Sequence, residues 1–325
     1  MDFLNLLKEI KTKKINNILK AILIVLFFTI GQIVFSQQQP YFLFFKQNMS
    51  LINPASTGIE GQMIGINYKT SMMGVENGPK VQSLIYHSNE NKNASWGISL
   101  QNEKVNIESY GIASFDYRYK LQITSNTEIN FGLKGGVFFN SIDINSIERV
   151  TQESNPSLNL VNNYWNPILG MGVFLKGNNY FLGVSINNLL NSNRYQEENG
   201  IVSQAIDKGQ LFVSSGIDIK INNSLTLRPS LIYSFVKNLD NQLTAITNLE
   251  IIDKISIGLG VSNNYYTNYQ VLFKGFKNFE FGFGYESRNG INSQNLTSAL
   301  KANNTELLFR YRIIINKVRK SSWDN

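Results

Sequence analysis

The chain has 325 residues, a formal net charge of +7, one histidine and no cysteine. Disulfide bonds and thiol chemistry are therefore excluded. Zinc sites need His or Cys ligands in numbers that this chain lacks, so we expect neither a cofactor nor a metal site.

Residues 1–36 have the order of a secretory signal peptide. Five lysines between Lys8 and Lys20 precede an apolar stretch at residues 21–35, and small residues at Val34 and Ser36 predict cleavage after Ser36. An uncleaved anchor is the weaker alternative, because a transmembrane helix needs about 20 apolar residues. Removing this segment lowers the net charge to about +4. The basic cluster that remains, at residues 317–320, does not predict a nucleic-acid partner.

Period-two alternation of apolar and polar residues dominates the chain from Gly61 onward and predicts strands. The clearest case is residues 109–123, where Phe115, Tyr117 and Tyr119 alternate with charged side chains. Many of the predicted strands approach the ~9–11 residues of a tilted membrane strand. We expect about 14 strands, at residues 61–69, 80–87, 94–101, 109–123, 128–139, 167–176, 180–186, 210–221, 225–236, 242–252, 255–261, 269–276, 279–285 and 305–315.

The connections between these strands alternate in length. Connections from even to odd strands are short, whereas the others include nearly all the long segments, with residues 237–241 as the exception. Short periplasmic turns and long extracellular loops are typical of a transmembrane antiparallel β-barrel of the outer membrane. Because lipid offers no partner to backbone polar groups, the last strand must pair with the first. The predicted organisation is a signal at 1–36, a periplasmic or plug segment at 37–60, a barrel at 61–315 and a tail at 316–325.

Several short blocks occur in a recognisable order. They are Gln39-Pro40-Tyr41-Phe42, Gln47-Asn48-Met49, Asn53-Pro54-Ala55-Ser56-Thr57-Gly58, Gly78-Pro79-Lys80-Val81-Gln82 and Asp116-Tyr117-Arg118-Tyr119. In order and spacing this combination resembles the PorP/SprF family of the type IX secretion system. Two features depart from the family pattern. Lys46 stands where the family has a small polar residue, and a tail at residues 316–325 follows the last strand.

The resemblance implies a protein that acts with the type IX secretion machinery of Bacteroidetes, which also serves gliding motility. Some family members assist secretion and contact periplasmic machinery. Others partner a large surface adhesin that they help to export and hold at the cell surface.

The residues themselves say less about the segment before the first strand. Asn53-Pro54 is typical of a turn, in which Gly58 is free to adopt positive φ. Residues 37–58 either fold back as a partial plug in the periplasmic mouth or form a flexible lead-in.

Catalytic chemistry has little support in the sequence. His87 and Ser88 invite comparison with outer-membrane phospholipases, but adjacent strand residues point to opposite faces, and a third orienting group is needed. We therefore interpret His87 as an interfacial residue near a strand end. Inward-facing charges either line a pore or cross-link a plugged barrel; they include Asp116, Arg118, Lys120, Lys134, Asp218, Lys220, Arg228, Arg310 and Arg312.

We therefore expect a non-enzymatic outer-membrane protein that binds the C-terminal domain of a secreted protein or adhesin. The candidate partner-binding loops are residues 140–163, followed by Tyr164 and Trp165, and residues 187–209, which contain Arg194 and Tyr195. The expected partners are secretion machinery components, that secreted protein and outer-membrane lipid. The alternative is a diffusion channel or porin, and a third class is a lipolytic enzyme.

Overall fold

The computed structural model describes residues 42–72, 78–106, 108–142, 164–190, 192–198, 201–207, 209–236, 241–263, 266–288 and 303–314. These residues belong to one compact unit, residues 37–325. The predicted signal peptide and the predicted tail lie outside the described residues. Among the helices that are described, none is long and apolar enough to cross a lipid bilayer.

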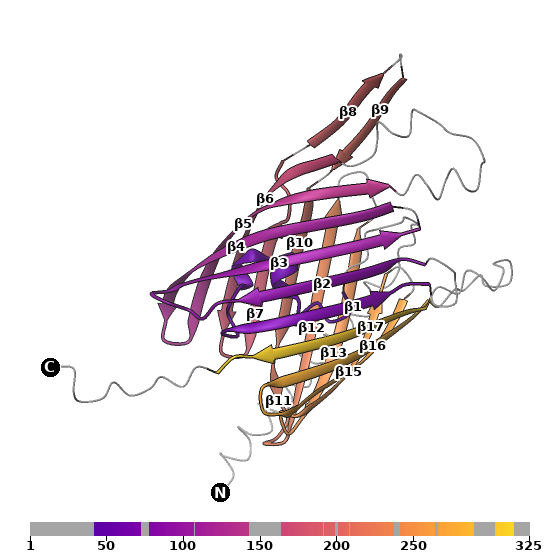
Figure 1. Ribbon diagram of the computed structural model, residues 1–325. Helices are drawn as coiled ribbons and strands as arrows, with labels where there is room; N and C mark the ends of the chain where they lie inside the picture. The colour runs from indigo at the N-terminus through magenta and orange to yellow at the C-terminus, as the bar shows by residue number, and fades with distance from the viewer. Residues whose placement is uncertain are drawn as a thin grey trace, which may run out of the picture. The chain divides into compact units, whose positions relative to one another are not determined.

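Nearly all of the described chain is β-strand (Figure 1). The strands are β1 (Met63–Thr70), β2 (Lys80–His87), β3 (Ala94–Val105), β4 (Glu108–Thr124), β5 (Thr127–Ile142), β6 (Tyr164–Gly177), β7 (Tyr180–Ile186), β8 (Ser192–Glu198), β9 (Ile201–Asp207), β10 (Gln210–Ile217), β11 (Ile219–Lys220), β12 (Leu225–Val236), β13 (Gln242–Ile251), β14 (Ile255–Ser262), β15 (Tyr266–Phe276), β16 (Phe279–Arg288) and β17 (Asn304–Arg312).

All these strands except β8 and β9 form one antiparallel sheet that closes on itself. Neighbours in sequence are neighbours in space, β10 pairs with both β7 and β12, and β11 continues β10 after Asp218. The described strands therefore form a closed barrel of 14 strand positions. The predicted pairing of the last strand with the first is confirmed, since Met63 lies opposite Arg312 and Thr70 opposite Thr305.

The barrel is apolar outside and polar inside. On β3, Trp96, Ile98 and Leu100 point outward and are 40–46% exposed, whereas Ser95 and Ser99 point inward and are almost fully buried. The other long strands repeat this arrangement. A water-soluble protein hides such side chains from solvent, so this outer surface is suited to acyl chains.

Connection lengths differ from the prediction at one end of the barrel. We expected residues 237–241 to be the one short connection on the extracellular side, and this is wrong. The β3–β4 connection is only 106–107, because the ladder continues through Asn102 opposite Gly111 to Val105 opposite Glu108. The β14–β15 connection is residues 263–265. The paired strands thus extend further along the chain than the apolar alternation from which they were predicted. The predicted loop at 187–209 also contains a separate hairpin, β8–β9.

Residues 42–62, here called the inner segment, lie inside the barrel. The segment contains α2 (Met49–Ile52) and a 3-10 helix, η1 (Pro54–Ser56), which Figure 1 shows in indigo among the strands. Its apolar side chains meet inward-facing apolar residues of the wall. Phe45 and Met49 share a buried cluster with residues of β6, β10, β12 and β13, and Phe44 packs against Leu272 and Leu308. Burying each such aromatic side chain contributes about 1.5–3 kcal/mol.

Candidate functional site

Asn53 fixes the turn of the inner segment and ties it to the wall. Its side-chain oxygen accepts the backbone N–H of Ala55 at 2.9 Å and so caps η1. Its side-chain nitrogen donates to the carbonyl of Val173 on β6 at 3.1 Å and, more weakly, to that of Val184 on β7. The Asn-Pro turn predicted from sequence is thus an anchor as well. Gly58 adopts a φ of +69°, as predicted.

Three glycines of the wall make room for this turn. A Cβ atom on Gly132 would lie 2.0 Å from the backbone nitrogen of Ala55, and one on Gly172 would lie 2.1 Å from the Asn53 oxygen. A Cβ atom on Gly183 would lie 3.0 Å from the Asn53 nitrogen. The inner segment therefore packs directly against the wall, through its backbone at Gly132 of β5 and through the Asn53 side chain at Gly172 of β6 and Gly183 of β7.

Glu306 on β17 holds the beginning of the inner segment. Its carboxylate accepts the backbone N–H groups of Leu43 at 2.5 Å and Phe44 at 3.2 Å, and the side chain of Asn67 donates to it at 2.8 Å. The side-chain nitrogen of Gln270 donates to the carbonyl of Leu43 at 2.6 Å. The wall thus satisfies backbone groups of the segment that its own short helices leave without partners.

His87 lies inside the barrel, so the prediction that it is interfacial is wrong. It is buried, and its Nε2 is 2.8 Å from the hydroxyl oxygen of Ser50 in the inner segment. The neighbouring Ser88 hydroxyl accepts the backbone N–H of Trp96. Among the described residues no carboxylate hydrogen-bonds to the His87 ring, so this pair has no orienting acid. The pair is a buried hydrogen bond that joins the inner segment to β2.

Hydroxyl groups of the wall bind further carbonyls of the segment. The Ser185 hydroxyl donates to the carbonyl of Ile52 at 2.8 Å, and that of Ser95 to the carbonyl of Thr57 at 2.7 Å. Serine is short enough to leave the lumen free for the segment while still reaching its backbone. The segment is therefore bonded to β3 and β7, on different sides of its turn.

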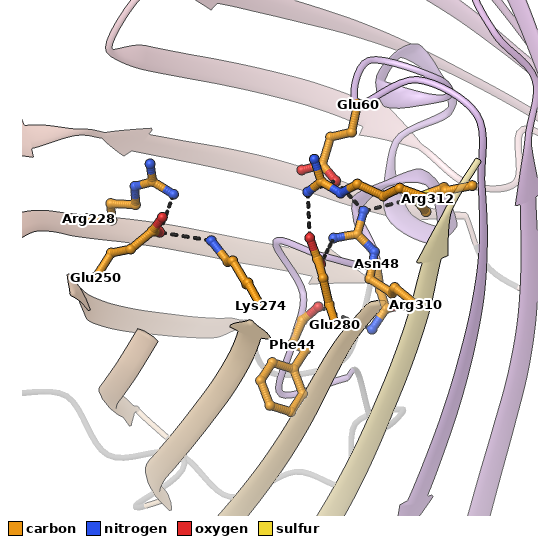
Figure 2. A network of polar contacts seen from close by, with 10 residues as sticks. Phe44, Asn48, Glu60, Arg228, Glu250, Lys274, Glu280, Arg310 and Arg312 are labelled. Carbon is orange, nitrogen blue, oxygen red and sulfur yellow. Dashed lines mark hydrogen bonds and ion pairs between the residues drawn. The ribbon is translucent and has the colours of Figure 1, made fainter. Parts of the chain in front are cut away.

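A network of charges crosses the periplasmic mouth (Figure 2). The guanidinium of Arg310 on β17 contacts Glu280 at 2.8 Å and Glu60 at the end of the inner segment. Arg312 contacts Glu280 at 2.7 Å and Glu60 at 3.4 Å. Desolvation at the mouth of the barrel raises the pKa of the Glu60 carboxyl, but the guanidinium groups of Arg310 and Arg312 outweigh this and hold that pKa at about 2. Glu60 is therefore ionised and closes the segment onto the wall through charge.

A second group of charges lies next to the first, on β12, β13 and β15 (Figure 2). Glu250 accepts from Arg228 at 2.5 Å and from Lys274 at 2.9 Å. Asp218 contacts Arg228 at 3.3 Å and Lys46 of the inner segment at 3.5 Å. Lys46, the residue that departs from the family pattern, thus takes part in docking the segment.

Other inward charges are paired as well, except Lys220, which is exposed near the periplasmic turn and has no ion pair among the described residues. Asp116 contacts Lys134 at 3.3 Å. Arg118 donates to Ser95 and Asn130 and forms an ion pair with Glu90 at 2.7 Å. Of the two interpretations of these charges, cross-linking within a filled barrel fits the contacts, whereas an open charged pore does not.

One cavity remains between the inner segment and the wall at the periplasmic mouth, with a volume of about 260 Å³. The Lys46 ammonium lies at its edge, 5.5 Å above the ring of Phe181. Burial lowers the pKa of Lys46, against the opposing effect of Asp218. Within the described chain no group of three or more His, Asp or Glu side chains has the arrangement of a metal site.

The other predicted residues lie apart from the inner segment. Lys80 and Gln82 are on the outward face of β2, at the opposite end of that strand from His87. Gly78 and Pro79 lie in the connection just before them. Tyr117 and Tyr119 also point outward and are 43% and 46% exposed.

The candidate partner-binding residues are at the extracellular end. Trp165 points outward on β6, is 70% exposed, and lies opposite Phe139. Tyr164 begins the same strand, and Arg194 and Tyr195 are on β8; the side chains of these three lie outside the described residues. Residues 143–163 of the predicted loop also lie outside them.

Sequence analysis did not single out Glu306 or the wall residues that receive the segment. A signal was present. Most inward-facing positions of the strands are polar, but a few are apolar, and these few are the positions that contact the inner segment. They are Val81, Ile85, Phe174, Phe212, Ile232, Ile246, Leu272 and Leu308.

Comparison with known structures identifies the fold. The toluene transporter TbuX of Ralstonia pickettii matches with a TM-score of 0.50 at 11% sequence identity, over 82% of this chain and 93% of that one. The Pseudomonas putida toluene transporter TodX matches with a TM-score of 0.47 at 10% identity, over 82% and 94%. At these identities the likeness concerns the barrel alone.

Comparison with sequences identifies the family. No curated protein matches the chain. The family model described as type IX secretion system membrane protein PorP/SprF matches residues 34–311. This range includes the inner segment and nearly all of the barrel. The chain therefore belongs to the PorP/SprF family of type IX secretion system membrane proteins.

Proposed function

We propose that this protein is a non-enzymatic outer-membrane anchor of the type IX secretion and gliding system. In this role it assists export of a secreted protein or adhesin and holds that protein at the surface through its C-terminal domain. The inner segment acts as a plug. The barrel supplies a rigid scaffold, and its partners are the secretion machinery on the periplasmic side and the cargo outside.

The observation that carries this proposal is the filled lumen. Inward-facing residues near the extracellular end are buried, including Lys69, Glu286 and Asn304. Nearer the periplasm, Phe44, Phe45 and Ala55 of the inner segment pack against the wall. A diffusion channel requires a continuous aqueous path, and water-filled porins leave one open. A barrel with a packed interior is better suited to holding a protein partner than to passing solutes.

The extracellular β8–β9 hairpin is the proposed cargo contact. It is paired only with itself among the described strands, so it is separate from the barrel wall. Arg194 lies opposite Ala205 and Tyr195 opposite Gln204 in its ladder. A two-stranded hairpin has outer edges to which an extended segment of another protein can add a strand. Trp165 occupies a position typical of interfacial aromatic residues, and we place it beside the contact surface.

Affinity purification from outer membranes tests the proposal. A tag on the tail recovers the full-length protein, and mass spectrometry identifies what accompanies it. We expect a secretion component and a large surface protein. A variant in which residues 192–207 are replaced by a two-residue Asn-Gly turn keeps the barrel and the secretion component but loses the surface protein.

The matched control alters a turn at the opposite rim by the single substitution Asn223→Gly, between β11 and β12. This control variant is expected to retain the surface protein, because the β8–β9 hairpin is unchanged in it. The anchor proposal would be contradicted if the full-length protein recovered neither a secretion component nor a large surface protein.

A further inference from the structure

An aromatic cluster lies on the outer face of the barrel, at the periplasmic ends of β15, β16 and β17. The ring centroids of Phe279 and Tyr311 are 4.7 Å apart, and those of Phe281 and Phe309 are 5.2 Å apart. Phe273 and Phe276 meet edge to face at 5.4 Å. These rings belong to the surface that faces the membrane.

A β-bulge shapes this cluster. The register of β15 against β16 shifts between Phe273 and Phe276, so β15 carries one extra residue there. In an unbroken strand, Phe273 and Phe276 would point to opposite faces. The extra residue places both on the outer face, and Phe276 is 61% exposed. Bulges commonly redirect side chains at barrel rims next to functional sites.

An apolar hollow lies next to the bulge, at the β15–β16 turn. Phe276, Lys277, Phe279 and Phe281 line the hollow, which has a volume of about 430 Å³. Lys277 is held in the tight β15–β16 turn at a φ of +40°.

The neighbouring β13–β14 turn carries the exposed Lys254. Its backbone carbonyl accepts the N–H of Lys274 at 2.6 Å, which holds this turn against the end of β15, near the β15–β16 turn. Asp253, also exposed, is the acidic residue of these turns. The pair of turns therefore carries a net positive charge.

We propose that this hollow binds one anionic glycerophospholipid of the periplasmic leaflet. An acyl chain lies against the rings of Phe276, Phe279 and Phe281, and the phosphate lies near Lys277 and Lys254. Aromatic residues at barrel ends lie at headgroup level, and basic residues there attract anionic lipids. The cluster continues the apolar belt of the barrel, so lipid is the occupant that its position favours over a protein.

Native mass spectrometry of the full-length, delipidated protein tests this proposal. The probe is an equimolar mixture of phosphatidylglycerol and phosphatidylcholine with matched acyl chains. Each lysine near an anionic headgroup is worth about 1 kcal/mol, so we expect retention of one phosphatidylglycerol with at least about a fivefold preference. Phe276→Ala weakens retention of both lipids.

The double variant Lys254→Gln/Lys277→Gln separates the contribution of charge from nonspecific hydrophobic binding of lipid. It is expected to retain both lipids equally, because the hollow remains while the positive charge is lost. Lys92→Gln is the control, since Lys92 is also an exposed turn lysine with positive φ, at +47°. Heat-modifiable mobility in SDS gels verifies that each variant is folded. Equal retention of both lipids by the unaltered protein, or an equal loss of preference in Lys92→Gln, would overturn the proposal.

Discussion

Glu306 and Leu43 are 263 positions apart, yet the carboxylate of Glu306 accepts the backbone N–H of Leu43 at 2.5 Å. Glu306 lies on β17, the strand that pairs with β1 and so closes the barrel. The strand that completes the ring is thus also the strand that holds the beginning of the inner segment. Closure of the barrel and docking of the segment are therefore coupled.

Replacing Glu306 with alanine is expected to release the beginning of the segment. Two backbone N–H groups, those of Leu43 and Phe44, lose their acceptor inside the barrel, and each unsatisfied group costs about 1–3 kcal/mol. Protease cleavage within residues 42–48 should increase, and the unfolding temperature should fall. Glu306→Gln keeps an acceptor oxygen and should give an intermediate effect. Equal protease resistance of Glu306→Ala and the unaltered protein would contradict this role.

Gly132→Ala is expected to displace the turn at Asn53, because its Cβ atom would overlap the backbone of Ala55. Overpacking of this kind costs about 1–3 kcal/mol. The matched control is Gly135→Ala on the same strand, where an added Cβ atom meets nothing within 4 Å. Thermal unfolding monitored by SDS gel mobility compares the two variants. The same shift in both would mean that Gly132 does not act through the segment.

Acid is expected to loosen the end of the inner segment. The pKa of Glu60 is lowered from 4.5 to about 2 in the folded protein, so its ion pairs stabilise the docked segment fully above about pH 4.5. That stabilisation is lost as the pH falls toward 2. Pepsin cleavage between Glu60 and Met63 should therefore increase over this range.

Glu60→Gln provides the control for the acid experiment. It removes the ion pairs at every pH, so its cleavage by pepsin is expected to be raised already at about pH 4.5 and to change less as the pH falls toward 2. Glu250 and Glu280 remain in this variant, and the difference between the two proteins isolates Glu60. An identical pH dependence of both would contradict the assignment.

His87→Ala is expected to leave ester hydrolysis unchanged at background level, because the His87–Ser50 pair has no orienting carboxylate among the described residues. It should instead lower the unfolding temperature, since the hydroxyl of Ser50 loses its partner. Hydrolysis of short-chain and phospholipid esters by the purified protein is the measurement. Activity that disappears in both His87→Ala and Ser50→Ala would show that the protein is an enzyme.

The barrel was largely predictable from the sequence because membrane strands follow a strict rule. Strands β2, β7 and β12 begin and end where alternation predicted, and the last strand pairs with the first. Across the hydrocarbon core, lipid favours apolar outward side chains and requires every backbone group to be paired. Both requirements leave a period of two in the sequence.

The interior was less predictable, because its contacts join residues far apart in the chain. Asn53-Pro54 predicted a turn, but nothing local indicates that Gly132, Gly172 and Gly183 receive it. The bulge between Phe273 and Phe276 was missed for a similar reason, since an extra residue is recognised only against its partner strand. His87 was assigned to the interface because its partner, Ser50, lies outside the barrel strands.

Single-channel recording in planar bilayers tests most directly the central claim that the inner segment closes the barrel. The unaltered protein is expected to show no steady open channel, whereas a variant lacking residues 37–58 is expected to conduct stably once folding is verified by SDS gel mobility. A stable, porin-like conductance of the unaltered protein, unchanged by the deletion, would contradict the account.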